Sequence, residues 1–279
     1  MSAVTDAAAL EVLVPGPPGT VLATDDDEAL LALFDDPPVR AATGAHVRGI
    51  MIASLDGAAT GPDGRSGSLG DAADHRVFGA LRALADVVLV GAGTVRAEGY
   101  ADVQVPERLR AARARRGRTE RVELAVVTGS GVLPDEVLDG DALVVTASGA
   151  EGLPALRDRV GGDRLVLADP VGPERDDADG PPRVDAAAAV RALAERGLTR
   201  IHAEGGPGLL AELLAAGAVD ELCLTLAPLL VGGLARRPLV GGTPTWPGRT
   251  GALLTEPTRL ELLHLLRAGD TLLGRWRVP

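Results

Sequence analysis

The sequence contains no lysine, because all 28 residues counted as lysine or arginine are arginines. A chain without lysine cannot form the Schiff base of an ordinary pyridoxal-phosphate enzyme, and it cannot provide the lysine of a phosphate-binding P-loop. It also contains a single cysteine, Cys223, which excludes disulfide bonds within the chain. Because Cys223 lies in an apolar run, we expect it to be a buried structural thiol.

Long apolar runs and clustered positive charge are absent as well. No apolar run approaches the roughly 20 residues of a membrane-spanning helix, and residues 1–6 carry an acid in place of the basic start of a signal peptide. The net charge of −11 disfavours nucleic acid as a partner, because affinity for phosphate backbones comes from clustered cations. The one basic run, residues 108–121, is typical of the solvated face of a helix. We therefore expect a cytoplasmic enzyme with a small-molecule substrate.

Motifs for metal binding and for a serine nucleophile are also missing. The four histidines, His46, His75, His202 and His264, are scattered without an H-E-x-x-H pair, and no G-x-S-x-G elbow occurs. His202 and Glu204 match one half of a zinc deaminase signature, but the other half requires paired cysteines. We expect no metal, and we interpret His202 as a packed or hydrogen-bonded strand residue. His75 is expected on a helix face, and His46 and His264 are given no role.

The most informative segment is residues 201–210, where an apolar run ends in Glu204, two glycines follow, and a helix begins with Pro207 in its first turn. Proline suits that position because a first-turn N–H has no helical partner, and Gly217 is placed to end the helix. Glycines at such a turn let an anion approach the backbone N–H groups. The pattern predicts a diphosphate site beside the Glu204 carboxylate, at the carboxyl end of a strand. The alternative is a tight turn that serves only helix–sheet packing.

A second glycine turn strengthens the prediction of an anion site. Residues 86–98 are again an apolar run that leads into glycines and a short helix. The run is rich in valine and has no polar alternation, which is typical of a strand covered on both faces. Two such turns in one domain indicate an extended ligand with phosphate groups, such as a dinucleotide.

Strands and helices alternate along the chain, and the last two strands form a hairpin. Helices are predicted at residues 26–34, 71–84, 108–121, 153–160, 185–196 and 207–217. Strands are predicted at residues 47–54, 87–90, 124–128, 142–146, 165–167, 201–204, 219–226, 259–267 and 271–278, with an acidic loop at 172–182. We expect an α/β fold with a mixed, mostly parallel sheet, helices on both faces and an antiparallel C-terminal hairpin. Residues 1–45 are expected to be an N-terminal extension with one short helix, and residues 46–279 a single domain.

Four motifs carry a family resemblance. They are Met-Ile-Ala-Ser-Leu-Asp-Gly at 51–57, Phe-Gly-Ala-Leu-Arg-Ala-Leu-Ala-Asp at 78–86, Gly-Ala-Gly-Thr-Val-Arg-Ala-Glu at 91–98, and the block from Glu-Gly-Gly-Pro at 204–207 to Val-Gly-Gly at 231–233. In this order they resemble the pyrimidine reductase family of bacterial riboflavin biosynthesis, whose fold is that of dihydrofolate reductase. The resemblance covers roughly residues 47–278. Bifunctional members carry a zinc deaminase domain in front, and this chain resembles a stand-alone reductase of actinobacterial type.

The resemblance implies an NADPH-dependent oxidoreductase that reduces the ribosylamino group of 5-amino-6-(5-phosphoribosylamino)uracil to the ribitylamino product. Glu204 and Asp56 are the implied catalytic carboxylates, and Ser66, Arg82 and Glu204 the implied substrate contacts. The implied cofactor contacts are Ala53, Thr94, Glu98, Thr128, Ser130, Gly205, Gly206, Pro207, Gly208, Leu209 and Leu210. Because family members are commonly dimers, the resemblance also implies a homodimer.

The chemistry of the implied reaction explains why carboxylates are expected near the reacting carbon. An imine accepts hydride best when it is protonated, so a nearby carboxylate can stabilise the iminium charge or pass a proton. The planar fork of an arginine such as Arg82 suits a phosphate or a pyrimidine carbonyl. The segment from Thr128 to Ser130 is neutral and small, which tolerates the 2′-phosphate of NADPH, and Arg96 is a candidate partner for that phosphate.

Two departures from the family pattern keep the substrate open. The proline and the phosphate-binding arginine that usually follow the position of Glu98 are missing from residues 99–105, and the tryptophan expected after Ser66 is absent. One alternative is a reductase of dihydrofolate or another heterocyclic imine, in which Glu204 would hold the pterin edge. Another is a non-catalytic regulator that binds NADPH.

Overall fold

The computed structural model describes residues 8–17, 19–34, 37–100, 102–169, 184–233, 237–238 and 257–279. Parallel strands form the larger part of its sheet: β3 (His46–Ser54), β4 (Val87–Gly91), β5 (Glu123–Val127), β6 (Leu143–Thr146), β7 (Leu165–Leu167), β8 (Arg200–Ala203) and β9 (Glu221–Ala227). The position of β4 between two hydrophobic cores explains why its sequence lacks polar alternation. Val88 and Val90 lie in one hydrophobic core, and Val87 and Leu89 lie in the other. Both faces of this strand are therefore covered.

Antiparallel strands complete the sheet: β1 (Leu10–Val14), β2 (Thr20–Leu22), β10 (Glu261–Ala268) and β11 (Thr271–Arg277). The strands β10 and β11 are the predicted C-terminal hairpin. The strands β1 (five residues) and β2 (three residues) were not predicted. Residues Leu10 and Val12 are nevertheless buried, and β1 pairs with β10. Part of the expected N-terminal extension thus belongs to the sheet.

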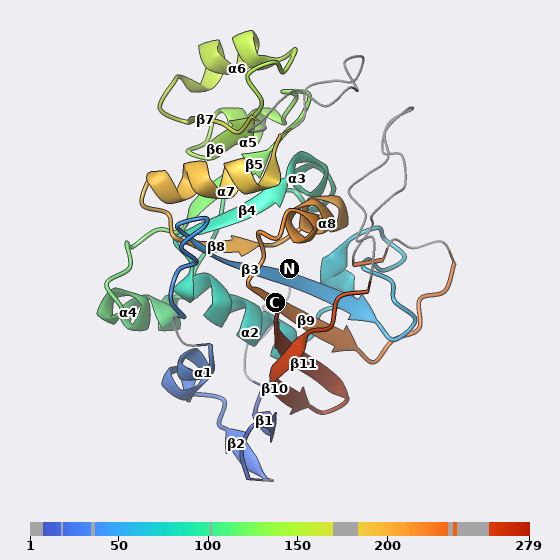
Figure 1. Ribbon diagram of the computed structural model, residues 1–279. Coiled ribbons are helices and arrows are strands. Elements are labelled where there is room, and N and C mark those ends of the chain that lie inside the picture. Colours follow the sequence, from blue (N-terminus) through green and yellow to red (C-terminus); the bar gives the residue numbers. More distant parts are fainter. Residues whose placement is uncertain are drawn as a thin grey trace.

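The strand order is β2-β1-β10-β11-β9-β3-β8-β4-β5-β6-β7, which gives one continuous sheet of eleven strands (Figure 1). Every neighbouring pair from β9 to β7 is parallel, and every pair from β2 to β9 is antiparallel. The predicted class, a mixed and mostly parallel α/β sheet with an antiparallel hairpin, is confirmed. The order places β3, β8, β4 and β5 side by side, so that the four strands end at the same edge of the sheet.

Helices cover both faces of this sheet (Figure 1). The apolar side chains of six helices lie in one core: α1 (Asp27–Leu33), α2 (Ala72–Leu84), α3 (Ala92–Glu98), α4 (Glu107–Arg115), α5 (Asp135–Leu138) and α6 (Leu153–Val160). The second core contains α7 (Ala186–Glu195) and α8 (Pro207–Ala215). Within the described ranges, no helix is both long and apolar enough to cross a membrane. The predicted loop at 172–182 lies outside the described residues.

The arginine-rich helix α4 corrects one prediction. Residues 108–121 were expected to be solvated, whereas Arg113 is 1% exposed. Its guanidinium donates to the carbonyl oxygens of Ala83 and Ala85 at 3.1 and 2.5 Å and to that of Arg121 at 3.0 Å. Burial lowers the pKa of Arg113 to about 10. The side chain thus satisfies carbonyl groups at the end of α2, which an apolar residue cannot do.

A buried charge cluster joins α1 to the sheet. Glu221 accepts hydrogen bonds from the Nε of Arg48 and the Nε of Arg275, both at 2.8 Å, and all three residues are buried. The same arginines donate to the carbonyl oxygens of Phe34 and Leu33 at 3.2 and 2.6 Å. Although burial opposes the charge, the hydrogen bonds from His46 and Arg275 lower the pKa of Glu221. One carboxylate therefore holds two cations against the end of α1.

Three histidines surround this cluster. His46, His202 and His264 are 4%, 2% and 3% exposed, so the prediction of a packed His202 is confirmed. His46 and His264, which were given no role, are buried as well. The Nε2 of His202 lies 3.4 Å from the Nη1 of Arg48, and the ring of His264 meets that of Phe34 edge to face at 4.6 Å. Burial and the neighbouring arginines lower the pKa of His202 and lower that of His264 to about 4.

The substitution Glu221→Gln should lower the free energy of unfolding by about 3 to 5 kcal/mol, because it leaves two buried guanidinium groups without a counter-charge. Urea unfolding followed by circular dichroism measures this loss. Glu261→Gln is the matched control, because Glu261 forms an exposed pair with Arg277 in the β10–β11 hairpin. The control should change by less than about 1 kcal/mol. Equal losses in the two variants would contradict a role for Glu221 as the anchor.

The free energy of unfolding should also fall as the pH is lowered from 7.5 to 5, before the carboxylates titrate. The pKa of His264 is about 4 in the folded chain and about 6.5 in the unfolded chain, so only the unfolded state takes up a proton between these values. We expect the free energy of unfolding to be about 2 kcal/mol lower at pH 5 than at pH 7.5 from this residue alone. Urea titrations across this range measure the slope. His264→Gln should reduce it, and an unchanged slope would refute this explanation.

Candidate active site

The candidate site lies where β3, β8, β4 and β5 end at one edge of the sheet. Glu204 directly follows β8, and its N–H donates to the carbonyl oxygen of Leu89 in β4 at 3.1 Å. Ala53 lies near the end of β3, and Thr128 directly follows β5. Because these strands are neighbours, four segments that are far apart in the sequence meet at this edge. They carry most of the predicted cofactor contacts.

The two glycine turns are in direct contact. The N–H of Gly91 donates to the carbonyl oxygen of Gly205 at 2.9 Å. A Cβ atom added to Gly206 would lie 2.7 Å from the Oγ1 of Thr94, which is closer than real Cβ atoms approach another atom. Gly205 has a φ of +101°, a conformation that side chains rarely adopt. A side chain at position 205 would be strained by this φ, and one at position 206 would require Thr94 to move.

The helix α8 begins at this turn with donors available for an anion. Pro207 is its first residue, and no side chain caps the N-cap residue Gly206. The first helical bond runs from the N–H of Leu210 to the carbonyl oxygen of Gly206 at 3.1 Å. The N–H groups of Gly208 and Leu209 precede that bond, so they have no acceptor within the helix. This is the arrangement expected of a phosphate-binding turn.

A buried ion pair lies next to the turn. The Nε and Nη2 of Arg82, from α2, donate to the two carboxylate oxygens of Glu204 at 2.9 and 2.7 Å. The hydroxyl of Tyr100 donates to the same carboxylate at 2.9 Å. The side chain of Glu204 is 1% exposed and that of Arg82 is 16% exposed. The carboxylate thus accepts three hydrogen bonds and keeps its charge balanced away from solvent.

The surroundings fix the ionisation of both partners of Glu204. Burial opposes the charge of Arg82, but the hydrogen bonds and the charge of Glu204 raise its pKa. Burial and the charge of Glu204 raise the pKa of Tyr100, so the phenol keeps its proton. Sequence analysis did not select Tyr100. It is the single tyrosine of the chain and follows Glu98 by two residues, where the family proline is missing.

Two further predicted residues meet beside the site. The carboxylate of Glu98, the last residue of α3, accepts the N–H of Ser66 at 2.8 Å. Ser66 begins the short 3-10 helix η1 (Ser66–Ser68) in the long loop after β3. A predicted cofactor contact and a predicted substrate contact are therefore joined directly. The hydrogen bond holds the loop against α3.

Asp56 is hydrogen-bonded to a different part of the edge. Its carboxylate accepts the hydroxyl of Ser54 at 2.5 Å and the N–H groups of Val231 and Gly232 at 3.2 and 2.7 Å. These hydrogen bonds, that from Ser54 above all, lower the pKa of Asp56 to about 2. The residue is exposed and ties the loop after β3 to the loop after β9. This geometry supports a positioning role more directly than a catalytic one.

The hydroxyl groups at the end of β5 shape their own loop. The Oγ1 of Thr128 accepts the N–H of Gly131 at 3.1 Å, and the Oγ of Ser130 accepts the N–H of Val132 at 3.3 Å. Arg96 of α3 donates to the carbonyl oxygen of Val132 at 3.4 Å. The candidate partner for a 2′-phosphate is thus in contact with the loop that carries Thr128 and Ser130.

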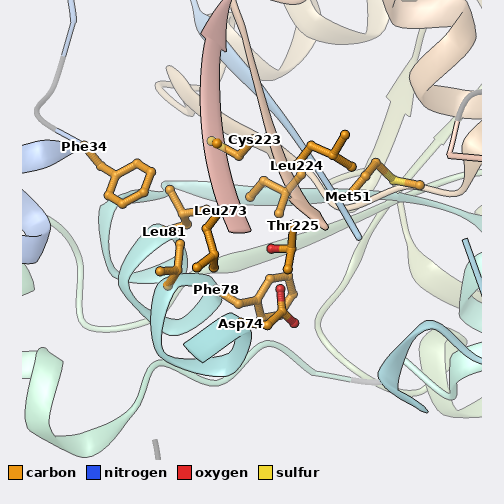
Figure 2. Close-up of a pocket in the computed structure, with 12 residues that line it drawn as sticks. Phe34, Met51, Asp74, Phe78, Leu81, Cys223, Leu224, Thr225 and Leu273 are labelled. Atoms are coloured by element: carbon orange, nitrogen blue, oxygen red, sulfur yellow. The ribbon is translucent and has the colours of Figure 1, made fainter. Parts of the chain in front are cut away.

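A small cavity, with room for little more than one water molecule, lies between α2 and the strands β3, β9 and β11 (Figure 2). Met51 and Phe78 line it on the side of the candidate site. The Sδ of Met51 would lie 3.4 Å from a Cβ added to Gly205, and the guanidinium of Arg82 lies 4.3 Å from the centre of the Phe78 ring. Met51 and Phe78 therefore connect the lining of this cavity to the glycine turn and to Arg82. In the described residues, no group of three or more His, Cys, Asp or Glu side chains is placed to hold a metal ion.

Removal of one partner of the buried Arg82–Glu204 pair should lower the free energy of unfolding strongly. Removal of both partners should lower it by less than the sum of the two single losses. Arg82→Met leaves the Glu204 carboxylate buried and unpaired, which should lower the free energy of unfolding by about 3 kcal/mol. The double variant with Glu204→Gln should recover at least about 1 kcal/mol of that loss. Urea unfolding of the wild type, both single variants and the double variant gives the coupling energy. Additive effects, within about 0.5 kcal/mol, would show that the pair is not coupled.

A comparison with known families and structures covers most of the chain. The model of the RibD C-terminal domain matches residues 45–273. The crystal structure of a pyrimidine reductase-like protein from Corynebacterium diphtheriae is similar with a TM-score of 0.67 at 26% sequence identity, over 90% of this chain and 98% of that one. The residues that match the family model include the edge of the sheet described above, from Ala53 to Leu210.

Two relatives by sequence have names that refer to riboflavin biosynthesis or to a reductase. The riboflavin biosynthesis protein RibD of Mycobacterium tuberculosis is 28% identical over 190 residues, which are 67% of this chain and 43% of that protein. The 2,5-diamino-6-ribosylamino-4(3H)-pyrimidinone 5′-phosphate reductase of Archaeoglobus fulgidus is 28% identical over 190 residues, which are 66% of this chain and 80% of that protein. The matched part is thus less than half of the mycobacterial protein.

Proposed function

Because the chain belongs to the RibD C-terminal domain family, we propose that it is an NADPH-dependent reductase of a ribosylamino-pyrimidine phosphate, as in riboflavin biosynthesis. The observation that carries this proposal is the Arg82–Glu204 pair beside the two glycine turns. A buried carboxylate next to a phosphate-binding turn is suited to a reaction that develops positive charge beside a dinucleotide. The reductase name of the Archaeoglobus fulgidus relative supports the same reaction class.

The residues present fit a dinucleotide. A side chain at Gly206 would collide with the hydroxyl of Thr94, and the uncapped start of α8 offers N–H donors to a diphosphate. Thr94 and Glu98 follow the second glycine turn, and Thr128 and Ser130 follow the next strand of the sheet. In this proposal, residues 205–210 hold the diphosphate, and the loop at Thr128 holds the adenosine end with Arg96 near its 2′-phosphate.

The chain supplies placement and charge for the reaction, and NADPH supplies the hydride. The substrate carbon that accepts the hydride must belong to an imine, and an imine accepts hydride most readily as an iminium cation. The Glu204 carboxylate, held by Arg82 and Tyr100, stabilises that positive charge. Its three hydrogen bonds fix the carboxylate before the substrate arrives, so little reorganisation is needed during the reaction. Asp56 and Glu98 position the loops around this centre.

The proposal includes a homodimer, which the resemblance implies, and a cytoplasmic location, which the composition led us to expect. Apolar side chains on the antiparallel strands support a dimer. Val21 is 57% exposed, and Val14 and Leu262 are 38% and 39% exposed. These residues lie on β2, β1 and β10, at the end of the sheet that is remote from β7. A second copy would cover this apolar surface without blocking the carboxyl edge of β8 and β4.

Turnover can be tested directly by the loss of nicotinamide absorbance when purified protein is mixed with NADPH. Ribosylamino-pyrimidine phosphates with a 2-oxo or a 2-amino ring and dihydrofolate are offered separately. We expect turnover of a ribosylamino-pyrimidine phosphate, with kcat at least about 100-fold lower in Glu204→Gln, because an amide cannot stabilise the cation as a carboxylate does. Turnover of dihydrofolate alone would show that the scaffold serves a different heterocycle. NADPH binding without turnover of any of the three would favour a regulator.

Gly206→Ala should weaken NADPH binding at least about tenfold, because the added methyl group would collide with Thr94 and displace the start of α8. Fluorescence titration of NADPH measures the dissociation constant. Gly162→Ala is the matched control, because a Cβ at Gly162 would meet nothing within 4 Å and the residue lies remote from the site. If Gly206→Ala bound NADPH as tightly as this control, the turn would not be the diphosphate site.

A further inference from the structure

The hydroxyl of Tyr100 contacts both members of the Arg82–Glu204 pair. It donates to the Oε2 of Glu204 at 2.9 Å and accepts from the Nη2 of Arg82 at 3.4 Å. The same Nη2 donates to the same Oε2 at 2.7 Å. The three polar atoms therefore form a closed triangle, in which the Tyr100 hydroxyl uses its donor and one of its acceptor lone pairs.

The two carboxylate oxygens of Glu204 differ as a result. Oε2 accepts from Arg82 and from Tyr100, whereas Oε1 accepts from the Nε of Arg82 at 2.9 Å. These are the hydrogen bonds that the carboxylate makes within the described residues. Each oxygen of an ionised carboxylate can accept about two hydrogen bonds. Oε2 is thus saturated, and Oε1 keeps the capacity to accept one more donor from a ligand.

The end of α3 explains how Tyr100 reaches this position. Gly99 caps the helix with a φ of +78°, and its N–H donates to the carbonyl oxygen of Val95 at 2.9 Å. This left-handed cap favours glycine and ends the helix directly before Tyr100. The helix α3 begins after Gly91, which donates to Gly205. One short helix therefore connects Tyr100 to the contact between the two glycine turns.

The ring of Tyr100 makes a contact that is separate from those of its hydroxyl. The rings of Tyr100 and Phe78 both pack against the core that contains α2 and α3. The Cζ of Arg82 lies 5.7 Å from the centre of the Tyr100 ring and 4.3 Å from that of Phe78. Aromatic faces at such distances attract a guanidinium. A phenylalanine at position 100 would keep this contact and lose the hydroxyl alone.

We propose that Tyr100 is a positioning residue, whose hydroxyl holds the Glu204 carboxylate so that Oε1 is the oxygen that meets the positive charge formed on the substrate. The proposal rests on the proposed function and makes it more specific. Tyr100 itself passes no proton, because burial and the charge of Glu204 raise the pKa of the phenol. Without the hydroxyl, Arg82 alone would hold the carboxylate. A small displacement of the carboxylate would then slow a step that depends on its alignment.

The kinetics of Tyr100→Phe test the role of the hydroxyl in the full chain. We expect kcat to be at least about tenfold lower than in the wild type, with KM for the ribosylamino-pyrimidine phosphate within about twofold, because the hydroxyl acts on alignment and not on substrate binding. A kcat equal to that of the wild type would overturn the proposal. So would a higher KM with an unchanged kcat, which would show that the hydroxyl contributes to binding alone.

Thr43→Val is the matched control for the loss of a hydroxyl. The Thr43 hydroxyl also donates one hydrogen bond and accepts one, both with the backbone of Ala45, at 3.2 and 3.4 Å. It lies before the start of β3, at the opposite edge of the sheet from the site. The control should keep kcat and KM within about twofold of the wild type, as expected for a substitution remote from the reacting groups.

A second measurement uses the fact that Tyr100 is the only tyrosine of the chain. Tyrosine labelled with ¹³C at Cζ gives one NMR signal, which reports the ionisation of this phenol alone. We expect no titration of the wild type up to about pH 11, whereas a free tyrosine titrates near about pH 10. In Glu204→Gln the titration should enter this range, because the charge that opposes ionisation is removed. Titration of the wild type near pH 10, or the same behaviour in both proteins, would overturn the proposal.

The same NMR signal separates this proposal from the proposed function. The probes are 1-amino-1-deoxyribitol 5-phosphate, which carries an ammonium group in place of the iminium nitrogen, and ribitol 5-phosphate, which carries a hydroxyl there. We expect the ammonium compound to shift the Tyr100 signal more than the hydroxyl compound, and this difference to disappear in Glu204→Gln. If no pyrimidine is reduced but the difference is observed, the proposed function fails and the role of Tyr100 stands. Equal shifts with the two probes would overturn the role of Tyr100, even in an active enzyme.

Discussion

The close approach of two backbone turns is the constraint on which the site depends. Gly91 donates to Gly205 across neighbouring parallel strands, and a side chain at Gly206 would collide with the hydroxyl of Thr94. Parallel strands alone bring their ends to one edge, but contact between the turns also requires residues without a Cβ. Once the turns touch, the start of α8 and the start of α3 are fixed side by side. Glu204, which lies between β8 and its turn, is then held in place.

Arginine provides the cation in the buried contacts described above, because the chain contains no lysine. The planar fork of its guanidinium determines the geometry of these contacts. Arg113 donates to carbonyl oxygens at the end of α2, and Arg48 and Arg275 share Glu221 while reaching the end of α1. Arg82 binds both oxygens of Glu204. Each guanidinium satisfies several acceptors at fixed angles, which a lysine ammonium would do less specifically. The helices that carry the site are thus positioned by buried charge as well as by apolar packing.

The sequence predicted the strands, the helices and the two glycine turns well, because each is a local pattern. Valine runs predict covered strands, and Asp71 or Pro207 predicts the start of a helix. It did not predict β1, which depends on pairing with β10 some 250 residues away, as in the pair of Glu11 with Arg267. Nor did it predict the contact of Tyr100 with Glu204 or the burial of Arg113, since a single residue type has no period. Such contacts follow from the tertiary arrangement of elements and not from any one segment.

The charge balance of the site limits what Arg82 can bind. Its Nε and Nη2 already donate to Glu204, and the side chain of Glu204 is almost fully buried. A substrate phosphate would have to compete with that bidentate pair and would leave the carboxylate without its cation, at a cost of several kcal/mol. A neutral carbonyl oxygen requires no such exchange, because it can accept from the remaining edge of the guanidinium. The geometry therefore favours Arg82 as a partner for the ring or its side-chain oxygens, and the phosphate must find its cation elsewhere.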